Sequence, residues 1–363
     1  MKLIARTMAV RGALLACLVC IAVFRCAAET FEPIPDVIHL GRVFDVEACD
    51  LNGDGWIDLL ISDYVVGHGM RYGQTGRLFG EWVPADVPPR VRESGHGAAL
   101  GDLNGDGPLD AFLVYNQYPG RVLLNDGTGR WLDSGQEIAA GSLWGTSVSL
   151  ADSDGDGDLD AFVTYYQHGV RLYVNDGAGQ FTASDRALGA DFISVTPGDI
   201  DGDGDADLVG RVDADTVCIA EGVDGAYLRQ DRLVAPGCRR VLLLDANGDA
   251  RTDLLIVGNE GSSLWLGDVG GGFTRTEQLL GGAAKAAVGD VDGDGDEDLA
   301  IGATLWLNDG AGDFEIAQSF EVSLLTCVAL LDVDGDERPE LLLGSIDPET
   351  GSGPLAVYWN LED

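Results

Sequence analysis

The sequence predicts an all-β protein that is built from seven copies of one repeat. Apolar runs of four to seven residues are bounded by Gly and Asp, and no stretch after residue 28 keeps a helical period. An aspartate-rich loop of nine residues recurs along the chain, and the intervals between the first aspartates are 52, 50, 47, 46, 45 and 42 residues. A fixed period in this range is typical of repeat architectures.

Each loop carries oxygen-bearing side chains at its positions 1, 3, 5 and 9. Side-chain oxygens at alternate residues of a tight turn converge on one point, and Ca²⁺ accepts six to eight oxygens. We therefore expect Ca²⁺ at up to seven sites. The expected ligands are Asp50, Asn52, Asp54 and Asp58; Asp102, Asn104, Asp106 and Asp110; Asp152, Asp154, Asp156 and Asp160; Asp199, Asp201, Asp203 and Asp207; Asp245, Asn247, Asp249 and Asp253; Asp290, Asp292, Asp294 and Asp298; and Asp332, Asp334, Asp336 and Glu340.

Two of the seven loops depart from the pattern at position 6, where the other five have glycine. The fifth loop has Ala250 and the seventh has Glu337, and the seventh also ends in Glu340 instead of Asp. A Cβ atom at a turn position that requires a positive φ costs on the order of 1 kcal/mol. The fifth and seventh sites are therefore expected to bind Ca²⁺ most weakly.

The strands within a repeat can be read in order. In the second repeat, residues 97–101 lead into the acidic loop, and two apolar runs follow at 109–115 and 121–124. An Asn-Asp-Gly turn then reverses the chain into residues 130–132, and Asp-Gly between apolar runs is a strong hairpin signal. Residues 29–363 give about 48 residues per repeat, which matches one four-stranded propeller blade. The sequence therefore predicts a seven-bladed β-propeller.

The seventh repeat is incomplete. It has apolar runs at 325–331, 341–345 and 355–359, and the sequence stops four residues later without an outer strand. The segment that begins at Thr30-Phe31-Glu32 resembles the outer-strand start Gly272-Phe273-Thr274. We therefore expect residues 30–40 to complete blade seven, so that the N-terminal strand closes the ring without an open edge.

The first 28 residues have the pattern of a secretory signal peptide. Basic residues precede an apolar run at 12–24, and Cys26-Ala27-Ala28 supplies the small residues of a cleavage site. The apolar run is too short to span a bilayer comfortably. We expect residues 1–28 to be removed and the propeller to occupy 29–363, with no stable membrane span and with a secreted, periplasmic or cell-surface location.

Residues 29–363 contain 18 basic and 61 acidic residues, a net charge of −43. Such a surface repels nucleic acid and anionic membranes, so neither is expected as a partner. The expected ligand positions of the acidic loops contain 25 of these acidic residues. Much of the negative charge is therefore explained by metal binding. Four cysteines remain, namely Cys49, Cys218, Cys238 and Cys327. Disulfides are permitted in an exported chain, and the alternative of four small buried residues is favoured.

The repeat resembles a known family. The run from Gly289 to Leu299, with small apolar residues before it and Asn-Asp-Gly-x-Gly-x-Phe after it, resembles the FG-GAP or VCBS repeat. The best-known members are the propeller heads of integrin α subunits. The resemblance covers nearly all of residues 30–363 and implies the propeller fold and bound Ca²⁺. It implies no single activity, because family members include adhesins, receptor subunits and polysaccharide lyases.

Candidate ligand-binding residues lie at the end of the propeller opposite the acidic loops. In a four-stranded meander, the turns between strands two and three and the links between blades share that end. Aromatic rings beside hydrogen-bonding groups suit sugars or peptides. The candidates are His96, Tyr115, Tyr118, Trp144, Tyr166, His168 and Arg239.

Two functions fit these observations. The first is a non-catalytic, monomeric binding or adhesion module for a glycan or protein. The second is a polysaccharide lyase or hydrolase that uses His96, His168 or a tyrosine as base, with Arg239 neutralising a carboxylate. The chain has only four histidines and shows no zinc-type or nucleophile-elbow motif. Binding without catalysis is therefore favoured, and no catalytic residue is assigned.

Overall fold

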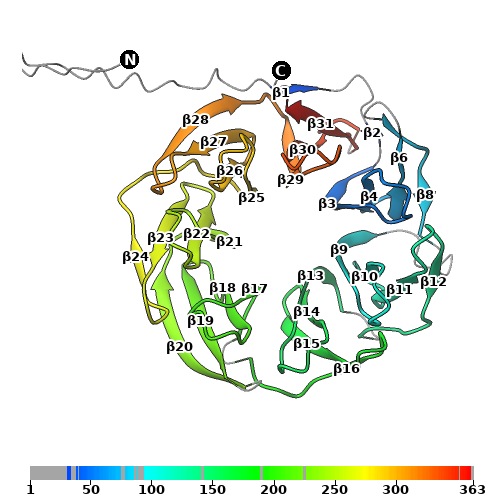
Figure 1. The fold of residues 1–363 in the computed structure, drawn as a ribbon, viewed down its shortest axis with the longest axis horizontal. Coiled ribbons are helices and arrows are strands. Elements are labelled where there is room, and N and C mark those ends of the chain that lie inside the picture. Colours follow the sequence, from blue (N-terminus) through cyan, green and yellow to red (C-terminus); the bar gives the residue numbers. More distant parts are fainter. Residues whose placement is uncertain are drawn as a thin grey trace, which may run out of the picture.

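Seven β-sheets stand in a ring around a common axis (Figure 1). The computed structural model describes residues 31–33, 38–39, 41–74, 78–85, 87, 94–139, 143–188, 191–223, 226–350 and 352–360. The regular structure of these residues is β throughout, and none of them belongs to a helix long and apolar enough to cross a membrane. The prediction of an all-β, seven-bladed propeller is confirmed, whereas the predicted signal peptide at 1–28 lies outside the described residues.

Each blade is an antiparallel sheet, and in six of the seven blades the strands run in sequence order from the centre of the ring to its rim. A two-stranded ribbon of β6 (Gly73–Gln74) and β7 (Leu78–Phe79) is inserted in blade 1. The blades are β3 (Val43–Cys49), β4 (Asp58–Asp63), β5 (Gly67–Arg71) and β8 (Val83–Pro84); β9 (Gly95–Gly101), β10 (Asp110–Tyr115), β11 (Arg121–Asn125) and β12 (Trp131–Asp133); β13 (Gly145–Ala151), β14 (Asp160–Tyr165), β15 (Gly169–Asn175) and β16 (Phe181–Ala183); β17 (Ser194–Gly198), β18 (Asp207–Arg211), β19 (Thr216–Val223) and β20 (Ala226–Val234); β21 (Cys238–Leu244), β22 (Asp253–Gly258), β23 (Ser263–Gly267) and β24 (Phe273–Arg275); β25 (Ala286–Gly289), β26 (Asp298–Ile301), β27 (Thr304–Asn308) and β28 (Phe314–Ser319); and β29 (Leu324–Leu331), β30 (Glu340–Ile346) and β31 (Pro354–Asn360), with β1 (Phe31–Pro33) and β2 (Ile38–His39).

The ring closes through both ends of the described chain. Strand β1 pairs antiparallel with β31, and Phe31 lies opposite Asn360. Strand β2 pairs with the other part of β31, where Ile38 lies opposite Leu355. The N-terminal segment therefore supplies the outer edge of blade seven, as the incomplete seventh repeat predicts.

The hydrophobic core is divided into clusters that lie between neighbouring blades. All six residues of β10, β14 and β22 are buried, because the second strand of a blade is covered by a blade on each side. One cluster joins Leu60 and Met70 of blade 1 to Leu113 and Leu123 of blade 2. A blade thus buries its apolar faces only by stacking on its neighbours, which makes the stability of the ring a nearest-neighbour property.

The four cysteines belong to these cores as free thiols. Cys218, Cys238 and Cys327 are buried members of three different clusters, and Cys49 is half-buried against a fourth. Burial raises the pKa of the Cys238 thiol to about 11 and that of Cys327 to about 12. The structure therefore agrees with four small packing residues, and no disulfide joins them.

A buried asparagine ties one blade to the next. Asn175 begins the Asn-Asp-Gly turn of blade 3, and its Nδ2 donates to the Leu103 carbonyl of blade 2 at 2.8 Å and to the Leu159 carbonyl at 3.2 Å. The same bond to the preceding blade is made by Asn125 to Leu51 and by Asn308 to Ala246, both at 2.9 Å. These asparagines satisfy loop carbonyls that would otherwise be buried without a donor.

Candidate functional site

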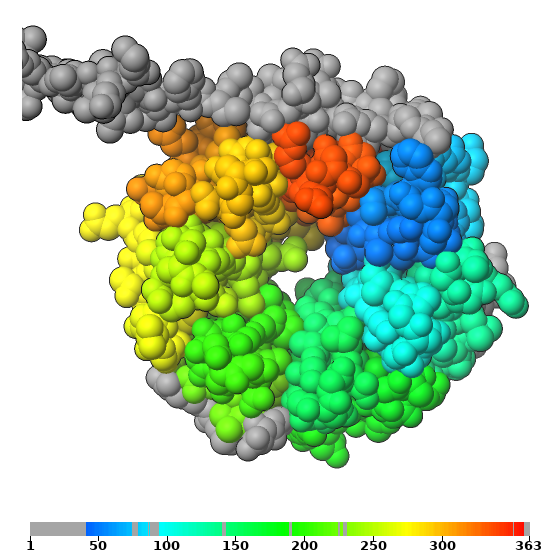
Figure 2. Space-filling model, in the orientation of Figure 1, coloured from blue at the N-terminus to red at the C-terminus, as the bar shows by residue number. Residues whose placement is uncertain are grey.

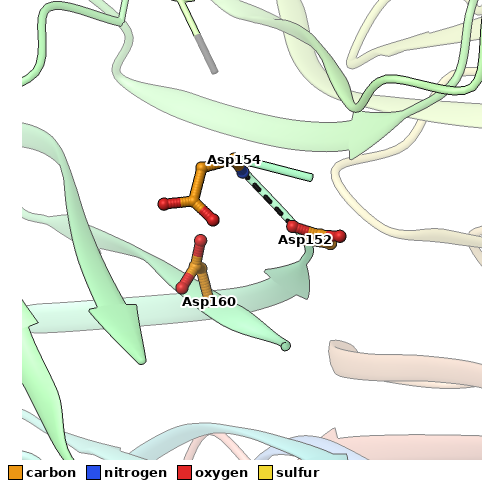
Figure 3. A group of neighbouring side chains, drawn as sticks. All are labelled: Asp152, Asp154 and Asp160. Carbon is orange, nitrogen blue, oxygen red and sulfur yellow. Dashed lines mark hydrogen bonds between the residues drawn. The ribbon is translucent and has the colours of Figure 1, made fainter. Parts of the chain in front are cut away.

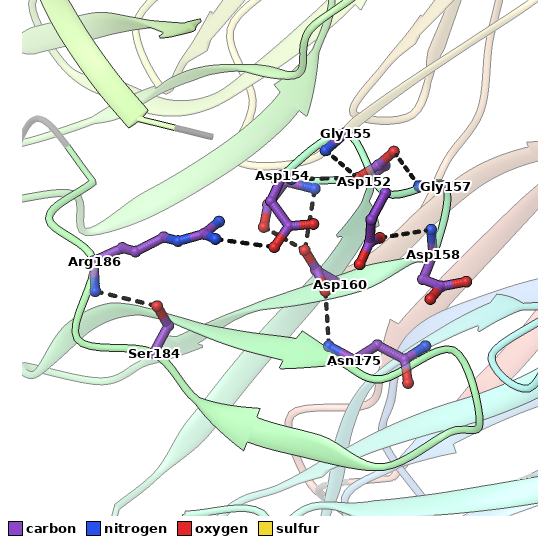
Figure 4. Close-up of polar contacts among 11 residues, drawn as sticks. Asp152, Asp154, Gly155, Gly157, Asp158, Asp160, Asn175, Ser184 and Arg186 are labelled. Carbon is purple, nitrogen blue, oxygen red and sulfur yellow. Dashed lines mark hydrogen bonds and ion pairs between the residues drawn. The ribbon is translucent and has the colours of Figure 1, made fainter. Parts of the chain in front are cut away.

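The acidic loops connect the first and second strands of the blades, so they share one end of the propeller. In the third loop, the Asp152 carboxylate accepts a hydrogen bond from the backbone N–H group of Asp154 at 3.2 Å (Figure 3). It also accepts from the backbone N–H groups of Gly155 at 2.8 Å and Gly157 at 2.9 Å (Figure 4). Burial alone would raise the pKa of Asp152, but these bonds stabilise the carboxylate and lower it. The position-1 residue thus organises the loop around an ionised oxygen pair.

The position-9 carboxylate fastens the loop to the blade. Asp160 is fully buried, and it accepts from the backbone N–H of Ser153 at 3.1 Å, from the Ser153 hydroxyl, and from the backbone N–H of Asn175 at 2.7 Å (Figure 4). Burial raises the pKa of the position-9 residue in all seven loops. It is raised in Asp160 and Asp253, to about 6 in Asp58, Asp110 and Asp207, to about 7 in Asp298 and to about 8 in Glu340.

The carboxylates of four loops converge closely enough to hold a metal ion. Within each group, one oxygen per residue lies within 4.8 Å of the others; the groups are Asp152, Asp154 and Asp160; Asp199, Asp201 and Asp203; Asp290, Asp292 and Asp294; and Asp332, Asp334 and Asp336. Hard cations prefer such an all-oxygen donor set. The other three loops have Asn52, Asn104 or Asn247 at position 3, which offers an amide oxygen instead of a carboxylate.

Arginine side chains already contact two of the loops. Arg186 donates to Asp154 Oδ2 in the third loop at 2.9 Å (Figure 4). In the fifth loop, Arg251 pairs with Asp249.

The fifth and seventh loops have the positive φ at position 6 that their sequences predict. Ala250 has a φ of 61° and Glu337 a φ of 74°. Both residues therefore carry the strain on which their predicted weak metal binding rests.

A cavity of about 1270 Å³ occupies the other end of the central channel and extends between blades 3 and 4. The centre of the ring is hollow in the space-filling view (Figure 2). Four of the predicted ligand residues line the cavity, namely His96, Tyr166, His168 and Arg239. Trp144 stacks on Tyr166, with ring centroids 5.8 Å apart and ring planes 16° apart, and both rings are about half exposed. The structure thus brings five of the seven candidates together.

The other two candidates belong to the core. Tyr115 is 1% exposed and packs between blades 1 and 2, and Tyr118 is a half-buried neighbour of the same cluster. Neither lines the cavity. Ala111, Leu113 and Tyr115 are alternate residues of β10 and pack in the same cluster, so the Tyr115 side chain faces the neighbouring blade. The structure therefore places the Tyr115 side chain in the core and not at the cavity, and Tyr118 packs against the same core.

His96 is held in one tautomer. Its Nδ1 lies 3.0 Å from the Thr146 carbonyl, which can only accept, so Nδ1 carries the proton. The ring stacks on Phe44 at 4.4 Å, with the planes 10° apart. Burial lowers the pKa of His96, and the charge of Lys285 adds to this effect. The neutral imidazole therefore leaves the Nε2 lone pair as an acceptor beside the cavity.

Charged residues on the inner strands complete the lining. Asp45 and Glu47 project from β3, while Arg240 and Lys285 belong to blades 5 and 6. Burial raises the pKa of Asp45, although Arg240 and Lys285 oppose the shift, and burial together with the Asp45 charge raises the pKa of Glu47 to about 8. Asp45, Arg240 and Lys285 each stand five residues before the first aspartate of their loop. A comparison of this position across the repeats would have found them.

A profile of the FG-GAP-like repeat matches residues 50–113, 102–163, 154–210 and 245–301, which together cover more than half of the chain. No curated protein matches the sequence significantly.

Three solved structures have a similar fold. A lectin from Agrocybe aegerita that recognises non-reducing terminal N-acetylglucosamine has a TM-score of 0.61 at 18% identity, over 88% of this chain and 85% of the lectin. A lectin from Burkholderia pseudomallei has a TM-score of 0.65 at 15% identity, over 88% and 100%. BBS1N, solved in complex with ARL6DN, has a TM-score of 0.62 at 11% identity, over 92% and 97%. At these identities the likeness concerns the fold alone.

Proposed function

The chain belongs to the FG-GAP-like repeat family, and from this premise we propose that it is a secreted, Ca²⁺-stabilised β-propeller that binds glycans without altering them. The observation that carries the proposal is the stacked, half-exposed pair of Trp144 and Tyr166 beside a cavity with polar walls. Aromatic faces cover the apolar face of a sugar ring, while neighbouring donors and acceptors bind its hydroxyl groups. The two lectins of similar fold support a saccharide over a protein partner.

The acidic loops have a structural role in this proposal. Each loop joins the first two strands of a blade, and its position-9 carboxylate bonds the third strand, as Asp160 does with Asn175. A bound Ca²⁺ ion would neutralise the crowded carboxylates and hold these strands together. Chelation should therefore lower the melting temperature. A melting temperature that is the same in chelator and in Ca²⁺ would contradict the stabilising role.

A glycan array tests the binding function, with Trp144→Ala and Tyr166→Ala as the diagnostic variants. Trp56→Ala is a matched control, because Trp56 is a 40% exposed indole on the first acidic loop, at the opposite end of the propeller. We expect the first two variants to lose about fivefold to a hundredfold in affinity and the control to bind normally, since stacking a ring on an aromatic side chain is worth about 1–3 kcal/mol for nucleic-acid bases. Equal binding by all three variants, or no glycan bound by the wild type, would refute the proposal.

The geometry of His96 supports a second candidate, a polysaccharide lyase or hydrolase. Its unprotonated Nε2, in a cavity that Arg239 and Tyr166 also line, is suited to a general base. The same glycans can be incubated with the protein and with His96→Ala, and their ends analysed by mass spectrometry. Unsaturated ends or hydrolysed bonds that disappear with His96→Ala would establish the enzyme, whereas bound but intact glycans agree with the binding module.

A further inference from the structure

The cavity has the opposite charge balance to the rest of the protein. Its lining contains five basic residues and three acidic ones, although residues 29–363 contain 18 basic and 61 acidic residues. The basic residues are Arg186, Arg211, Arg239, Arg240 and Lys285, and the acidic ones are Asp45, Glu47 and Asp191. More than a quarter of the cationic side chains of the propeller thus surround one space.

Some of these cations are engaged by other groups. Arg186 pairs with Asp154, and Arg211 donates from Nη1 to the Cys238 carbonyl at 3.1 Å. Arg239 faces Asn259, whose amide oxygen, when turned toward the guanidinium, accepts from Nη2 at 2.7 Å and from Nε at 2.9 Å. These contacts fix the position of the three guanidinium groups.

Arg240 and Lys285 are the available charges. Neither forms an ion pair with any residue in the described part of the chain. They occupy the same repeat position in adjacent blades, five residues before Asp245 and Asp290, so they project from the same level of the channel. A guanidinium and an ammonium at one level form a binding site for an anionic group.

The acidic residues across the channel offset only part of this charge, since Asp45 is the carboxylate on which both Arg240 and Lys285 act. Asp45 accepts a hydrogen bond from the Ala98 N–H at 3.2 Å, and its carboxylate is not ion-paired with Arg240 or Lys285. Because the pKa of Glu47 is raised to about 8, this side chain is mostly protonated at neutral pH and is a hydrogen-bond donor. The local balance at neutral pH therefore favours an anion.

We propose that the cavity selects acidic saccharides, with Arg240 and Lys285 binding a carboxylate or sulfate on one ring while Trp144 and Tyr166 stack on another. This inference rests on the proposed glycan-binding function. The volume of about 1270 Å³ is sufficient for several sugar rings. A protein of large negative charge repels polyanions at long range, so binding of an acidic saccharide requires a local cationic site such as this one.

The test compares acidic glycans with neutral counterparts of the same backbone. The probes are carboxylated oligosaccharides, their carboxyl-reduced forms and sulfated forms, applied to the wild type, Arg240→Ala, Lys285→Ala and the conservative Arg240→Lys. Arg130→Ala is a control, because Arg130 is exposed at the opposite end of blade 2. We expect each alanine variant to lose on the order of tenfold to a hundredfold in affinity for the acidic probe, with partial retention in Arg240→Lys and no change in Arg130→Ala.

The outcomes separate this inference from the function on which it rests. A preference for carboxylated over sulfated probes, or the reverse, identifies the anionic group. Equal binding of acidic and neutral probes overturns the inference and leaves the glycan-binding function intact, as does acidic-probe binding that Arg240→Ala and Lys285→Ala do not weaken. Failure of the wild type to bind any glycan overturns both.

Discussion

Replacing Asp160 with asparagine separates the two roles of the position-9 carboxylate. The carboxylate accepts from backbone N–H groups on both sides, at 3.1 Å from Ser153 and 2.7 Å from Asn175. An amide keeps one acceptor oxygen and places an NH₂ group against the other donor. One buried N–H is then left without an acceptor, which costs about 1–3 kcal/mol. Asp160→Asn should therefore destabilise the fold even when no metal is bound.

The size of the effect can be converted into a melting temperature. Unfolding entropy of about 2.1 cal/mol/K per residue gives about 0.7 kcal/mol/K for a chain of this length. A loss of about 2 kcal/mol then lowers the melting temperature by about 3 °C. The assay is thermal unfolding followed by circular dichroism, performed in excess chelator and again in excess Ca²⁺.

Asp156→Asn is the matched control. Asp156 is an exposed position-5 residue whose Oδ1 accepts from the Asp158 N–H at 3.0 Å, and the amide oxygen of asparagine can keep that bond. This variant should melt like the wild type in chelator and lose stability only in Ca²⁺. An unchanged melting temperature of Asp160→Asn in chelator would refute the hydrogen-bonding role and leave Asp160 as a metal ligand alone.

Three further predictions concern the loops and the links between blades. In chelator, the free energy of unfolding should fall as the pH rises from 4 to 7. Burial raises the pKa of Asp110 to about 6 and that of Asp298 to about 7, so the folded state binds more protons than the unfolded state in this range. Melting curves at pH 5 and pH 8 check this, and added Ca²⁺ should reduce the difference between the two melting temperatures. Ala250→Gly should stabilise the fold by about 1 kcal/mol, since φ is 61° at this residue; the exposed Ala178→Gly, whose φ is not positive, should show no gain in the same denaturation assay. Asn175→Ala should cost about 1–3 kcal/mol in chemical denaturation, because two backbone carbonyls lose their side-chain donor; an unchanged midpoint would exclude a stabilising link between blades.

The fold could be predicted because its determinants are local and repeated. The acidic loop, the Asp-Gly turn and the apolar runs each lie within a few residues, and seven copies reveal one period. The closure also followed from the sequence, because the seventh repeat lacks an outer strand that residues 31–33 supply. The positive φ of Ala250 and Glu337 followed from the glycine that the other loops have at position 6.

The cavity was harder to predict, because its lining comes from single positions in separate blades. Trp144 and Tyr166 were identified from residue type, but Asp45 and Glu47 lie within an apolar strand pattern and gave no local signal. The burial of Tyr115 could not be predicted for a related reason. It is the last residue of a strand whose six residues are all buried. Tyr166 lies one residue beyond the end of the equivalent strand in blade 3 and is about half exposed, so a difference of one position at a strand end decides between the core and the surface.

The pairing of Phe31 with Asn360 has a consequence for protein engineering. Since these residues are register partners in one sheet, a short linker can join them without distorting the ring. New chain ends can then be opened at an exposed Asp-Gly turn, such as the one that begins at Asp126. A circular permutant of this kind would keep every blade contact while moving the seam to another blade, so binding proteins could be fused at any chosen point on the rim.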